Sequence, residues 1–363
     1  MQKNNKSKVC IVSTVNLMHM TLVSLYTEYL QKNGIKYDIV YIDKYGVDEV
    51  NEANNVYKYC VKNTKSKILK MINVLRFTSY AKKIIRQNKY DLLIVWNELT
   101  AVLMSNFLAK KYKGKYIVNI RDYGFNDLPF IKKRTKRVIK SSSLTMVSSN
   151  RFLEFLPKMD KYLFVHSFNK KIFENVTFEY RKKESNQAIT ILFIGKMSYL
   201  QESKRFIEKL GNDKRFLLKF VGAGTEELKP FIEEKQFKNV EIIGAFSPND
   251  TAKYLVEADI INNLYKFGTT AEDTALSIKL YYSIYLKIPI LTYDNTNTNT
   301  YAEKAGVNIT IPNEEPTSMA DFIYNKYQCW DEKQAREKAG EVMKEIIDSQ
   351  NALNDKMKEI LKE

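Results

Sequence analysis

Short apolar runs rich in β-branched residues recur along the chain, and segments with helical spacing of apolar positions separate most of them. Such runs are typical of buried strands, and strands that alternate with helices favour a parallel sheet covered on both faces. The helical pattern over 20–34 ends at Gly34, as a helix with a glycine cap would. In the first half, strands are predicted at 8–14, 37–43, 90–97, 116–122, 144–149 and 162–168.

The same alternation begins again after the polar stretch 179–187, which is the best linker candidate. From about Thr317 the tail keeps helical spacing to its end, with Glu and Lys interleaved. In the second half, strands are predicted at 189–195, 216–222, 240–245, 259–265, 288–293 and 307–312, with helices such as 225–235 and 248–258 between them.

A length of 363 residues also favours two cores over one. We therefore expect an α/β fold of two Rossmann-like, doubly wound domains. The first would span 1–180 and the second 181–363, with a last helix that could pack back on the first domain. Such domains bind ligands beyond the C-terminal ends of their strands, so we expect the site in a cleft between the two.

Charge is distributed unevenly over the two halves. Residues 1–180 hold 32 Lys and Arg against 14 Asp and Glu, whereas 181–363 hold 26 against 28. The stretches 53–90 and 128–153 contain ten and seven basic residues and no acidic one. Either alone is typical of a solvated helix face, but together, with many apolar neighbours, they favour a surface that binds a polyanion. Anionic lipid headgroups and nucleic acid phosphates are the two candidates.

Cysteine and histidine usage makes several classes of protein improbable. The three cysteines lie far apart and the chain has two histidines, so neither a disulfide framework nor a zinc site is expected. The first apolar run is too short for a signal peptide, and no window reaches the ~20 apolar residues of a membrane span. We expect a cytoplasmic protein.

Glycines follow two predicted strands of the second half. Gly195 and Lys196 come directly after one strand, and Gly222 and Gly224 lie between the next strand and a helix. Glycine allows close approach of backbone to a ligand, and a helix start offers free N–H groups, so such a corner suits a diphosphate. A glycine after a strand is more often only a turn, and G-A-G is not the dinucleotide fingerprint. The serial order of the segments carries more weight than either fragment.

That order, "ILFIGKMSYLQESK", "LKFVGAGTEELKPFIEEK", "NVEIIGAFSPNDTAKYLVEADIINNLY" and "ALSIKLYYSIYLKIPILTYDN", resembles the nucleotide-sugar domain of GT-B glycosyltransferases. The likeness is to the family 4 type and its capsular or exopolysaccharide biosynthesis relatives. It covers 189 to about 312 and implies that 181–363 binds the donor, while 1–180 binds the acceptor and docks on a membrane.

The resemblance assigns roles to cations of the second half. Lys196 stands where the family has its diphosphate-binding Arg, and Gly195, Gly222 and Gly224 join it as donor-binding candidates. Lys204 is the best candidate for the family's second cation, although its spacing is two residues longer than usual. A solvated surface lysine is the alternative for each.

The segment 275–291 falls where the family has E-x7-E, written in some relatives as K-L-x-E-Y-L-A-x-G-x-P. Lys279 matches that variant and is expected to face donor phosphate or sugar. Tyr282 stands in place of the second glutamate, which in the family contacts the donor ribose. The first glutamate falls at Thr274, with Glu272 and Asp273 just upstream, so ribose recognition is expected to move to Glu272.

In the first half, "YIVNIRDYG" resembles the family strand that ends in His-Asp. Asp122 matches, and Arg121 takes the place of the histidine. Arg121 cannot act as a general base at pH 7, so it would hold a phosphate or carboxylate, unless it forms a local ion pair with Asp122. Further acceptor-side candidates are Asn16 and His19, in the loop after the first predicted strand, and His166 at the end of another strand.

The resemblance implies a retaining hexosyltransferase that uses a nucleoside-diphosphate-sugar, with neither metal nor cofactor. A UDP-sugar is the leading candidate for this donor. Its acceptor would be a polyprenyl-diphosphate-linked glycan of bacterial surface polysaccharide synthesis. The enzyme would be peripheral on the inner face of the plasma membrane, with no nucleic acid partner. The residues expected to carry the reaction are Lys196, Lys279, Glu272 and Asp122.

Two alternatives stay open. A sugar-nucleotide epimerase shares the architecture but would need carboxylates and histidines at the reacting carbon, and the chain has two histidines. A GT-B-like binding or assembly protein that has lost catalysis is the other, and Tyr282 in place of the family acid is its best support.

Overall fold

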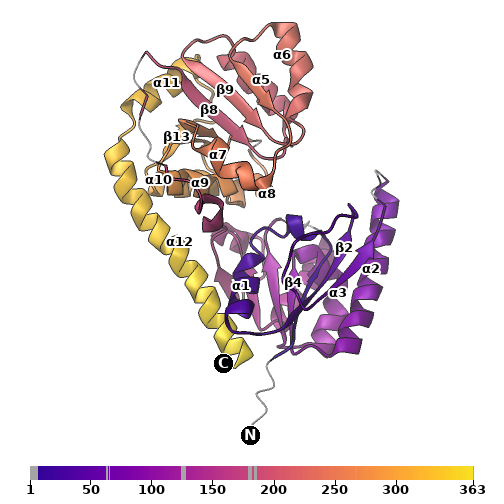
Figure 1. Ribbon diagram of the computed structural model, residues 1–363. Helices are drawn as coiled ribbons and strands as arrows, with labels where there is room; N and C mark the ends of the chain where they lie inside the picture. The colour runs from indigo at the N-terminus through magenta and orange to yellow at the C-terminus, as the bar shows by residue number, and fades with distance from the viewer. Residues whose placement is uncertain are drawn as a thin grey trace. The chain divides into compact units, whose positions relative to one another are not determined.

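A computed structural model describes residues 7–62, 64, 66–123, 128–178, 182–183, 186–265 and 267–362. The chain forms two compact units, each with its own sheet (Figure 1). Unit 1 comprises Met1–Ser167 with Asp348–Glu363, and unit 2 comprises Phe168–Ile347. The expected linker 179–187 lies partly outside the described residues.

Unit 1 is built on a parallel seven-stranded sheet of order β3-β2-β1-β4-β5-β6-β7. Five of its strands, β1, β2, β4, β5 and β6, are buried along their whole length, which explains their apolar runs. The strands are β1 (Val9–Ser13), β2 (Tyr37–Asp43), β3 (Asn55–Cys60), β4 (Leu92–Trp96), β5 (Tyr116–Ile120), β6 (Leu144–Val147) and β7 (Tyr162–Phe164).

Strand β3 was not predicted. It lies at the edge of the sheet, is half-exposed along its length, and contains Lys58 between two tyrosines, so it has no continuous apolar run. Its pairing with β2 is the only signal for it, and that pairing is not visible in the sequence.

Helices cover the sheet of unit 1 as the alternating pattern predicts. One core cluster joins the strands to Tyr26 of α1 and to Leu353, Met357 and Leu361 at the end of α12. The helices and 3-10 turns are η1 (Leu17–His19), α1 (Ser24–Lys32), α2 (Lys67–Asn88), α3 (Glu98–Lys111), α4 (Pro129–Ser141) and η2 (Asn150–Glu154).

Unit 2 contains a parallel six-stranded sheet of order β10-β9-β8-β11-β12-β13. Its strands are β8 (Ile189–Ile194), β9 (Phe216–Val221), β10 (Val240–Ile243), β11 (Ile260–Asn262), β12 (Ile290–Tyr293) and β13 (Asn308–Ile311). The helices and 3-10 turns are η3 (Lys170–Phe173), α5 (Leu200–Leu210), η4 (Thr225–Leu228), α6 (Lys229–Lys235), η5 (Pro248–Asp250), α7 (Thr251–Leu255), α8 (Thr270–Thr274), α9 (Ile278–Leu286), α10 (Asn297–Lys304), α11 (Met319–Cys329) and α12 (Glu332–Leu361). The predicted α/β class with two doubly wound sheets is confirmed.

The boundary between the units lies at Ser167, before the expected position at 180, because the segment after Ser167 packs in unit 2. Phe173 of η3 stacks on Tyr285 with ring centroids 4.3 Å apart, and it meets Tyr282 edge-on at 6.0 Å. The end of α12, in contrast, belongs to unit 1. No helix in the described ranges is long and apolar enough to cross a membrane.

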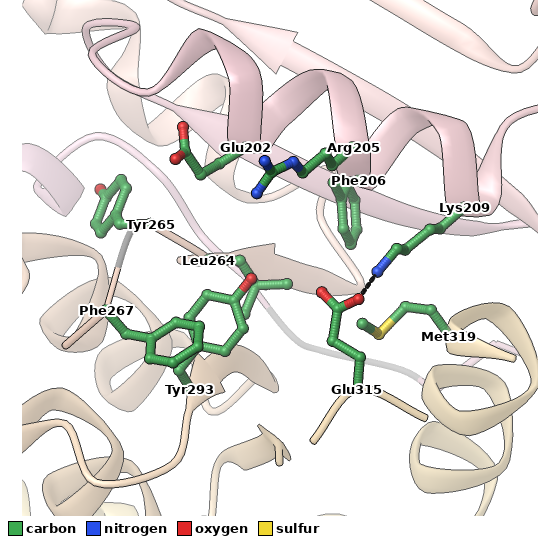
Figure 2. A pocket seen from close by; sticks show the side chains of 10 residues that line it. All are labelled: Glu202, Arg205, Phe206, Lys209, Leu264, Tyr265, Phe267, Tyr293, Glu315 and Met319. Atoms are coloured by element: carbon green, nitrogen blue, oxygen red, sulfur yellow. Dashed lines mark hydrogen bonds and ion pairs between the residues drawn. The ribbon is translucent and has the colours of Figure 1, made fainter. Parts of the chain in front are cut away.

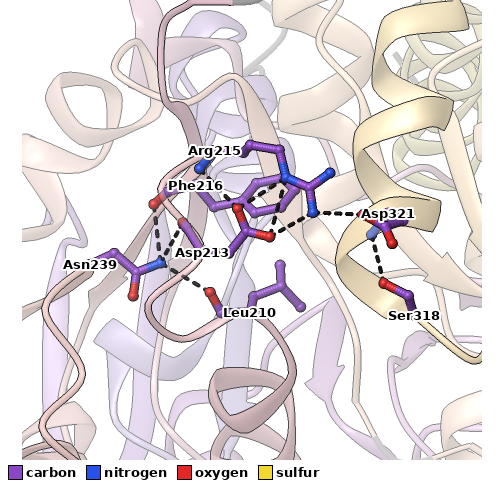
Figure 3. A network of polar contacts seen from close by, with 7 residues as sticks. All are labelled: Leu210, Asp213, Arg215, Phe216, Asn239, Ser318 and Asp321. Atoms are coloured by element: carbon purple, nitrogen blue, oxygen red, sulfur yellow. Dashed lines mark hydrogen bonds and ion pairs between the residues drawn. The ribbon is translucent and has the colours of Figure 1, made fainter.

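A polar network fixes the turn between α5 and β9 (Figure 3). The Asn239 side-chain amide donates to the carbonyl oxygens of Leu210, Asp213 and Phe216 at 3.0–3.1 Å. Arg215 binds Asp213 at 2.6 Å and Asp321 of α11 at 2.7 Å. The two amide hydrogens are shared among the three carbonyl groups, and those of Leu210 and Asp213 also accept from the backbone N–H groups of Asp213 and Phe216.

We predict that Asn239→Ala lowers the free energy of unfolding by roughly 1–3 kcal/mol, because each of the three carbonyl groups loses a hydrogen bond while two of them keep a backbone donor. Urea unfolding followed by circular dichroism measures the change. Asn249→Ala, at an exposed position in η5, is the matched control and should differ from wild type by less than about 0.5 kcal/mol.

Candidate functional site

The strand order of unit 2 reverses between β8 and β11, which pair in parallel at its centre. In doubly wound sheets, ligands bind in the crevice beyond the strand ends at such a reversal. Gly195 and Lys196 follow β8 there, and Asn263 and Tyr265 follow β11. The candidate site is therefore built around these two strand ends.

Lys279 lies at this point with its side chain buried, at 2% exposure. Helix α9 begins at Ile278, and the Ser277 hydroxyl caps it by accepting from the Lys279 backbone N–H at 3.3 Å. The Nζ atom lies 4.0 Å from the ring centroid of Phe193 and 4.5 Å from that of Tyr265. Among the described residues, none accepts a hydrogen bond from it.

Two aromatic faces stabilise this ammonium group only in part. A cation over an aromatic ring gains about 0.5–2 kcal/mol, whereas an unpaired buried charge costs several kcal/mol. Desolvation accordingly lowers the pKa of Lys279 to about 7. A buried cation without a counter-ion, at a ligand-binding strand end, suits an anionic ligand.

Glu272 belongs to the same constellation. Its Oε1 accepts a hydrogen bond from the Tyr199 hydroxyl at 2.6 Å, and this bond is the main reason that the pKa of Tyr199 rises to about 12. Its Oε2 is buried and accepts no bond from any residue that the structure describes. The rings of Tyr199 and Tyr265 lie 5.5 Å apart, so two tyrosines connect Glu272 to Lys279.

Asn263 is a further candidate, and the sequence analysis missed it. It follows β11, is buried, and its Oδ1 has no hydrogen-bond partner within the described part of unit 2. Two consecutive asparagines at the end of an apolar run were the available signal. An amide oxygen at this strand end could accept a hydrogen bond from a ligand hydroxyl.

The glycines at the strand ends differ in the space around their Cα atoms. A Cβ atom at Gly195 would meet nothing within 4 Å, so this backbone borders open space. At Gly222 a Cβ would lie 1.8 Å from the Gly195 carbonyl oxygen, so Gly222 is required for packing of the two loops.

Gly224 is bonded within the chain. Its backbone N–H donates to the Glu226 carboxylate at 3.0 Å, and the Ala245 N–H donates to the same group at 3.2 Å. Backbone N–H donors, including its own, lower the pKa of Glu226. A carboxylate of the chain therefore accepts the Gly224 N–H group that the sequence analysis assigned to donor binding.

The other two predicted cations of unit 2 lie at different places. Lys196 is exposed directly after β8, as expected for a residue at the ligand edge. Lys204 is half-buried on α5, and its Nζ lies 5.2 Å from the ring centroid of Phe231 in α6.

Tyr282 and Thr274, at the two glutamate positions of the resemblance, are both buried. Tyr282 belongs to the core cluster of unit 2, where burial raises its pKa to about 12. The Thr274 hydroxyl donates to the Thr270 carbonyl oxygen at 2.5 Å, and the Asp273 carboxylate accepts from the Gly268 N–H at 2.9 Å. Glu272 is thus the acid of this segment that lies beside Tyr199 and Tyr265.

A pocket of about 190 Å³ adjoins the site, with Tyr265 in its wall (Figure 2). The Lys209–Glu315 ion pair lies among the lining side chains, and the rings of Phe267 and Tyr293 contact each other at 4.5 Å. The pocket is smaller than the roughly 300–1,000 Å³ typical of ligand sites, so it fits one ring of a ligand and not a whole sugar nucleotide. Its wall consists of Glu202, Arg205, Phe206, Lys209, Leu264, Tyr265, Phe267, Tyr293, Glu315 and Met319.

Two predicted residues of unit 1 have local partners. The Asn16 amide donates to Asp43 at 3.0 Å and to Glu49 at 3.1 Å, and its oxygen accepts from the Lys44 N–H at 3.0 Å. Asn16 is thus a satisfied structural residue of the loop after β1. His19 is exposed, and its Nε2 shares a 2.9 Å hydrogen bond with the Tyr45 hydroxyl.

The remaining candidates of unit 1 lie at the ends of β5 and β7. Arg121 donates to the Ser167 hydroxyl at 2.6 Å, and its guanidinium lies 5.5 Å from the ring centroid of Trp96. Asp122 is exposed next to it. His166 is buried against Phe164, with ring centroids 4.4 Å apart.

Asn119 is the residue of unit 1 that sequence reasoning missed. It lies in β5 between Trp96 of β4 and Met146 of β6, fully buried. Neither its Oδ1 nor its Nδ2 has a hydrogen-bond partner among the residues described. An asparagine inside an apolar strand was the signal. Across the described ranges, no three His, Cys, Asp or Glu side chains are grouped to hold a metal ion.

Residues 8–142 match the model of a family described as glycosyl transferase 4-like. The match lies in the first half of the chain, whereas the motif resemblance lies in the second. No curated protein matches the chain in sequence.

Solved structures match over almost the whole chain. Sucrose-phosphate synthase from Thermosynechococcus elongatus matches with a TM-score of 0.72 at 10% identity, over 98% of both chains. A glycosyltransferase from Rickettsia africae matches at 0.69 and 15% identity, over 99% of both. Anabaena HepE in complex with UDP matches at 0.64 and 10% identity, over 97% of this chain and 100% of that one.

The chain has the GT-B fold. Identities of 10–15% establish shared architecture and leave the reaction to be argued from the site. In this GT-B chain the unusual group is the buried Lys279 ammonium.

We predict that Lys279→Met stabilises the GT-B chain in the absence of ligand. Below pH 7 the lysine is charged in the folded and unfolded states, so folding bears the full desolvation cost. Between pH 7 and 10.5 the unfolded state binds more protons, so wild-type stability rises with pH and the advantage of the variant fades. At pH 6 the variant should be more stable by roughly 2–4 kcal/mol.

Urea unfolding at pH 6, 7.5 and 9 measures this difference. Lys253→Met, at an exposed position in α7, is the matched control and should follow wild type at every pH. A Lys279→Met variant that is less stable than wild type at pH 6 would show that the ammonium group stabilises the fold.

Proposed function

We propose that the chain is a retaining hexosyltransferase that takes its sugar from a nucleoside-diphosphate-sugar, UDP-sugar first, without a metal or cofactor. The observation that carries this proposal is the Lys279 ammonium, which is buried at the strand reversal of unit 2 and has no partner among the described residues. Support comes from the family match in unit 1 and from a GT-B neighbour that holds UDP.

The diphosphate leaving group would supply the anion that Lys279 lacks. As the bond between the sugar C1 and the diphosphate oxygen breaks, negative charge builds on that oxygen, and a cation already in place stabilises it. The acceptor oxygen bonds to C1 on the same face, and its proton passes to the departing diphosphate. Lys196, exposed after β8, would add a second positive charge at the edge.

Glu272 would bind a hydroxyl group of the donor. Tyr199 orients its carboxylate, and the free Oε2 is the acceptor that a ribose or sugar hydroxyl requires. Because Tyr282 is packed in the core, Glu272 is the residue to which we assign the role of the missing family glutamate.

On the acceptor side, we assign binding to unit 1, with Arg121, Asp122 and Asn119 as the candidates. We propose a polyprenyl-diphosphate-linked glycan as acceptor, in capsular or exopolysaccharide synthesis at the inner face of the plasma membrane. The acid-free stretches 53–90 and 128–153, which contain α2 and α4, support docking on anionic lipid.

A catalytically inactive GT-B binding protein is the second candidate. The burial of Tyr282 favours it, because no carboxylate occupies that position. A sugar-nucleotide epimerase has less support, since both histidines lie in unit 1, against Tyr45 and Phe164.

We expect a thermal-shift screen with UDP, GDP and dTDP to find a stabilising ligand. At 100 times its dissociation constant, a ligand stabilises by ~2.7 kcal/mol and raises Tm by several degrees. Lys279→Met should bind the nucleotide at least tenfold more weakly, and Lys253→Met should bind it as tightly as wild type does.

Calorimetry at pH 8 in two buffers of different ionisation enthalpy should show proton uptake on nucleotide binding, because the diphosphate makes Lys279 take up a proton. The absence of any Tm increase with all three nucleotides would refute the donor site.

We expect Glu272→Gln to lower kcat/KM for transfer by 10- to 100-fold at unchanged Tm, because the amide retains the Tyr199 bond and loses the charge. Mass spectrometry of the glycan product measures transfer. Tyr199→Phe should have a smaller effect, since it removes only the orienting bond. Nucleotide binding without turnover of any donor, in wild type, would favour the binding-protein alternative.

A further inference from the structure

Helix α2 has a packed second half and an unpacked first half. From Phe77 onward it contributes buried side chains to unit 1, among them Ala81 and Ile85. No residue of 67–76 is buried. Figure 1 shows α2 at the outer edge of unit 1.

The unpacked half bears an apolar stripe. Ile68, Met71, Ile72 and Leu75, at helical spacing i, i+3, i+4 and i+7, are 71%, 64%, 37% and 52% exposed. Leu69, beside them, is 50% exposed. Single exposed apolar residues are ordinary, but a contiguous stripe of large side chains marks a binding surface. We call these four residues the α2 stripe.

Charge decides what the stripe binds. Lys67 and Arg76 flank it, Lys70 is exposed on the opposite side, and 53–90 contains ten basic residues and no acidic one. A helix with an apolar face and basic flanks lies in the interface of an anionic bilayer. Pairing with a second copy would bring two basic helices together and is disfavoured by like-charge repulsion.

We propose that the α2 stripe inserts into the headgroup and acyl boundary of an anionic membrane and anchors unit 1 there. The stripe lies outside the donor site, so it can be tested apart from transfer. It adds an apolar anchor to the electrostatic docking proposed above, and salt should weaken the electrostatic part alone.

The test is sedimentation with vesicles of phosphatidylglycerol and phosphatidylcholine, compared with phosphatidylcholine alone. Wild type should bind the anionic vesicles and keep part of that binding at 0.5 M salt. The variant Ile68→Gln/Met71→Gln/Ile72→Gln/Leu75→Gln retains charge and helix propensity, and its affinity should fall at least tenfold. Its Tm and nucleotide binding should equal those of wild type.

The matched control replaces exposed apolar residues elsewhere in unit 1, as Val50→Gln/Leu99→Gln/Leu153→Gln. It should bind vesicles as wild type does. Equal binding by the four-glutamine variant, or an equal loss in the control, overturns insertion of the stripe. Failure of wild type to bind vesicles overturns it too, as does dimerisation in light scattering that the four-glutamine variant abolishes.

A direct readout of depth comes from Met71→Trp. On anionic vesicles its added fluorescence should shift to the blue and be quenched by brominated lipid, with wild type as the baseline for the two native tryptophans. Binding without shift or quenching would show adsorption by charge alone and contradict insertion.

Discussion

Unit 2 contains one electrostatic conflict on which its strand ends depend: an ammonium group held in an aromatic and apolar interior. Phe193 from β8 and Tyr265 after β11 bring two neighbouring strand ends to the same lysine, and the capped start of α9 fixes its backbone. Burial of the surrounding core stabilises this arrangement, while the charge on Lys279 stays without a counter-ion among the described residues. An environment of this kind is built by folding alone, so under the proposed function an anion would need little reorganisation to bind there.

The sequence predicted architecture better than contacts. Every predicted strand lies at or near an observed one, because strands buried on both faces produce continuous apolar runs. Edge strand β3 was not predicted, because it is half-exposed around Lys58 and so has no continuous apolar run. Lys279 was singled out because a charge among apolar neighbours is visible in one dimension, and Glu272 because it lies just upstream of the position of a family glutamate. Asn263 and Asn119 were not, since a missing hydrogen-bond partner exists only in three dimensions. The partners of Asn16 are likewise invisible in the sequence, because Asp43 and Glu49 reach it from distant segments.

The C-terminal helix explains how the chain completes its first unit. Leu353, Met357 and Leu361 of α12 enter the core around β1 and β4. Next to them, the Ser349 hydroxyl accepts from the His166 N–H at 3.1 Å, and the Gln350 amide donates to the His166 carbonyl oxygen at 3.1 Å. The segment after β7, which ends unit 1, is thus held by residues almost two hundred positions later. Unit 1 cannot be complete until α12 has been synthesised.

Glu226 places a resident anion at the glycine turn after β9. Its carboxylate takes the Gly224 and Ala245 N–H groups, and those bonds keep it ionised. These N–H groups are therefore already occupied by a charged group of the chain itself. Its two hydrogen bonds tie the loop after β9 to the loop after β10, so a single carboxylate acts as a clasp that keeps both loops in one conformation.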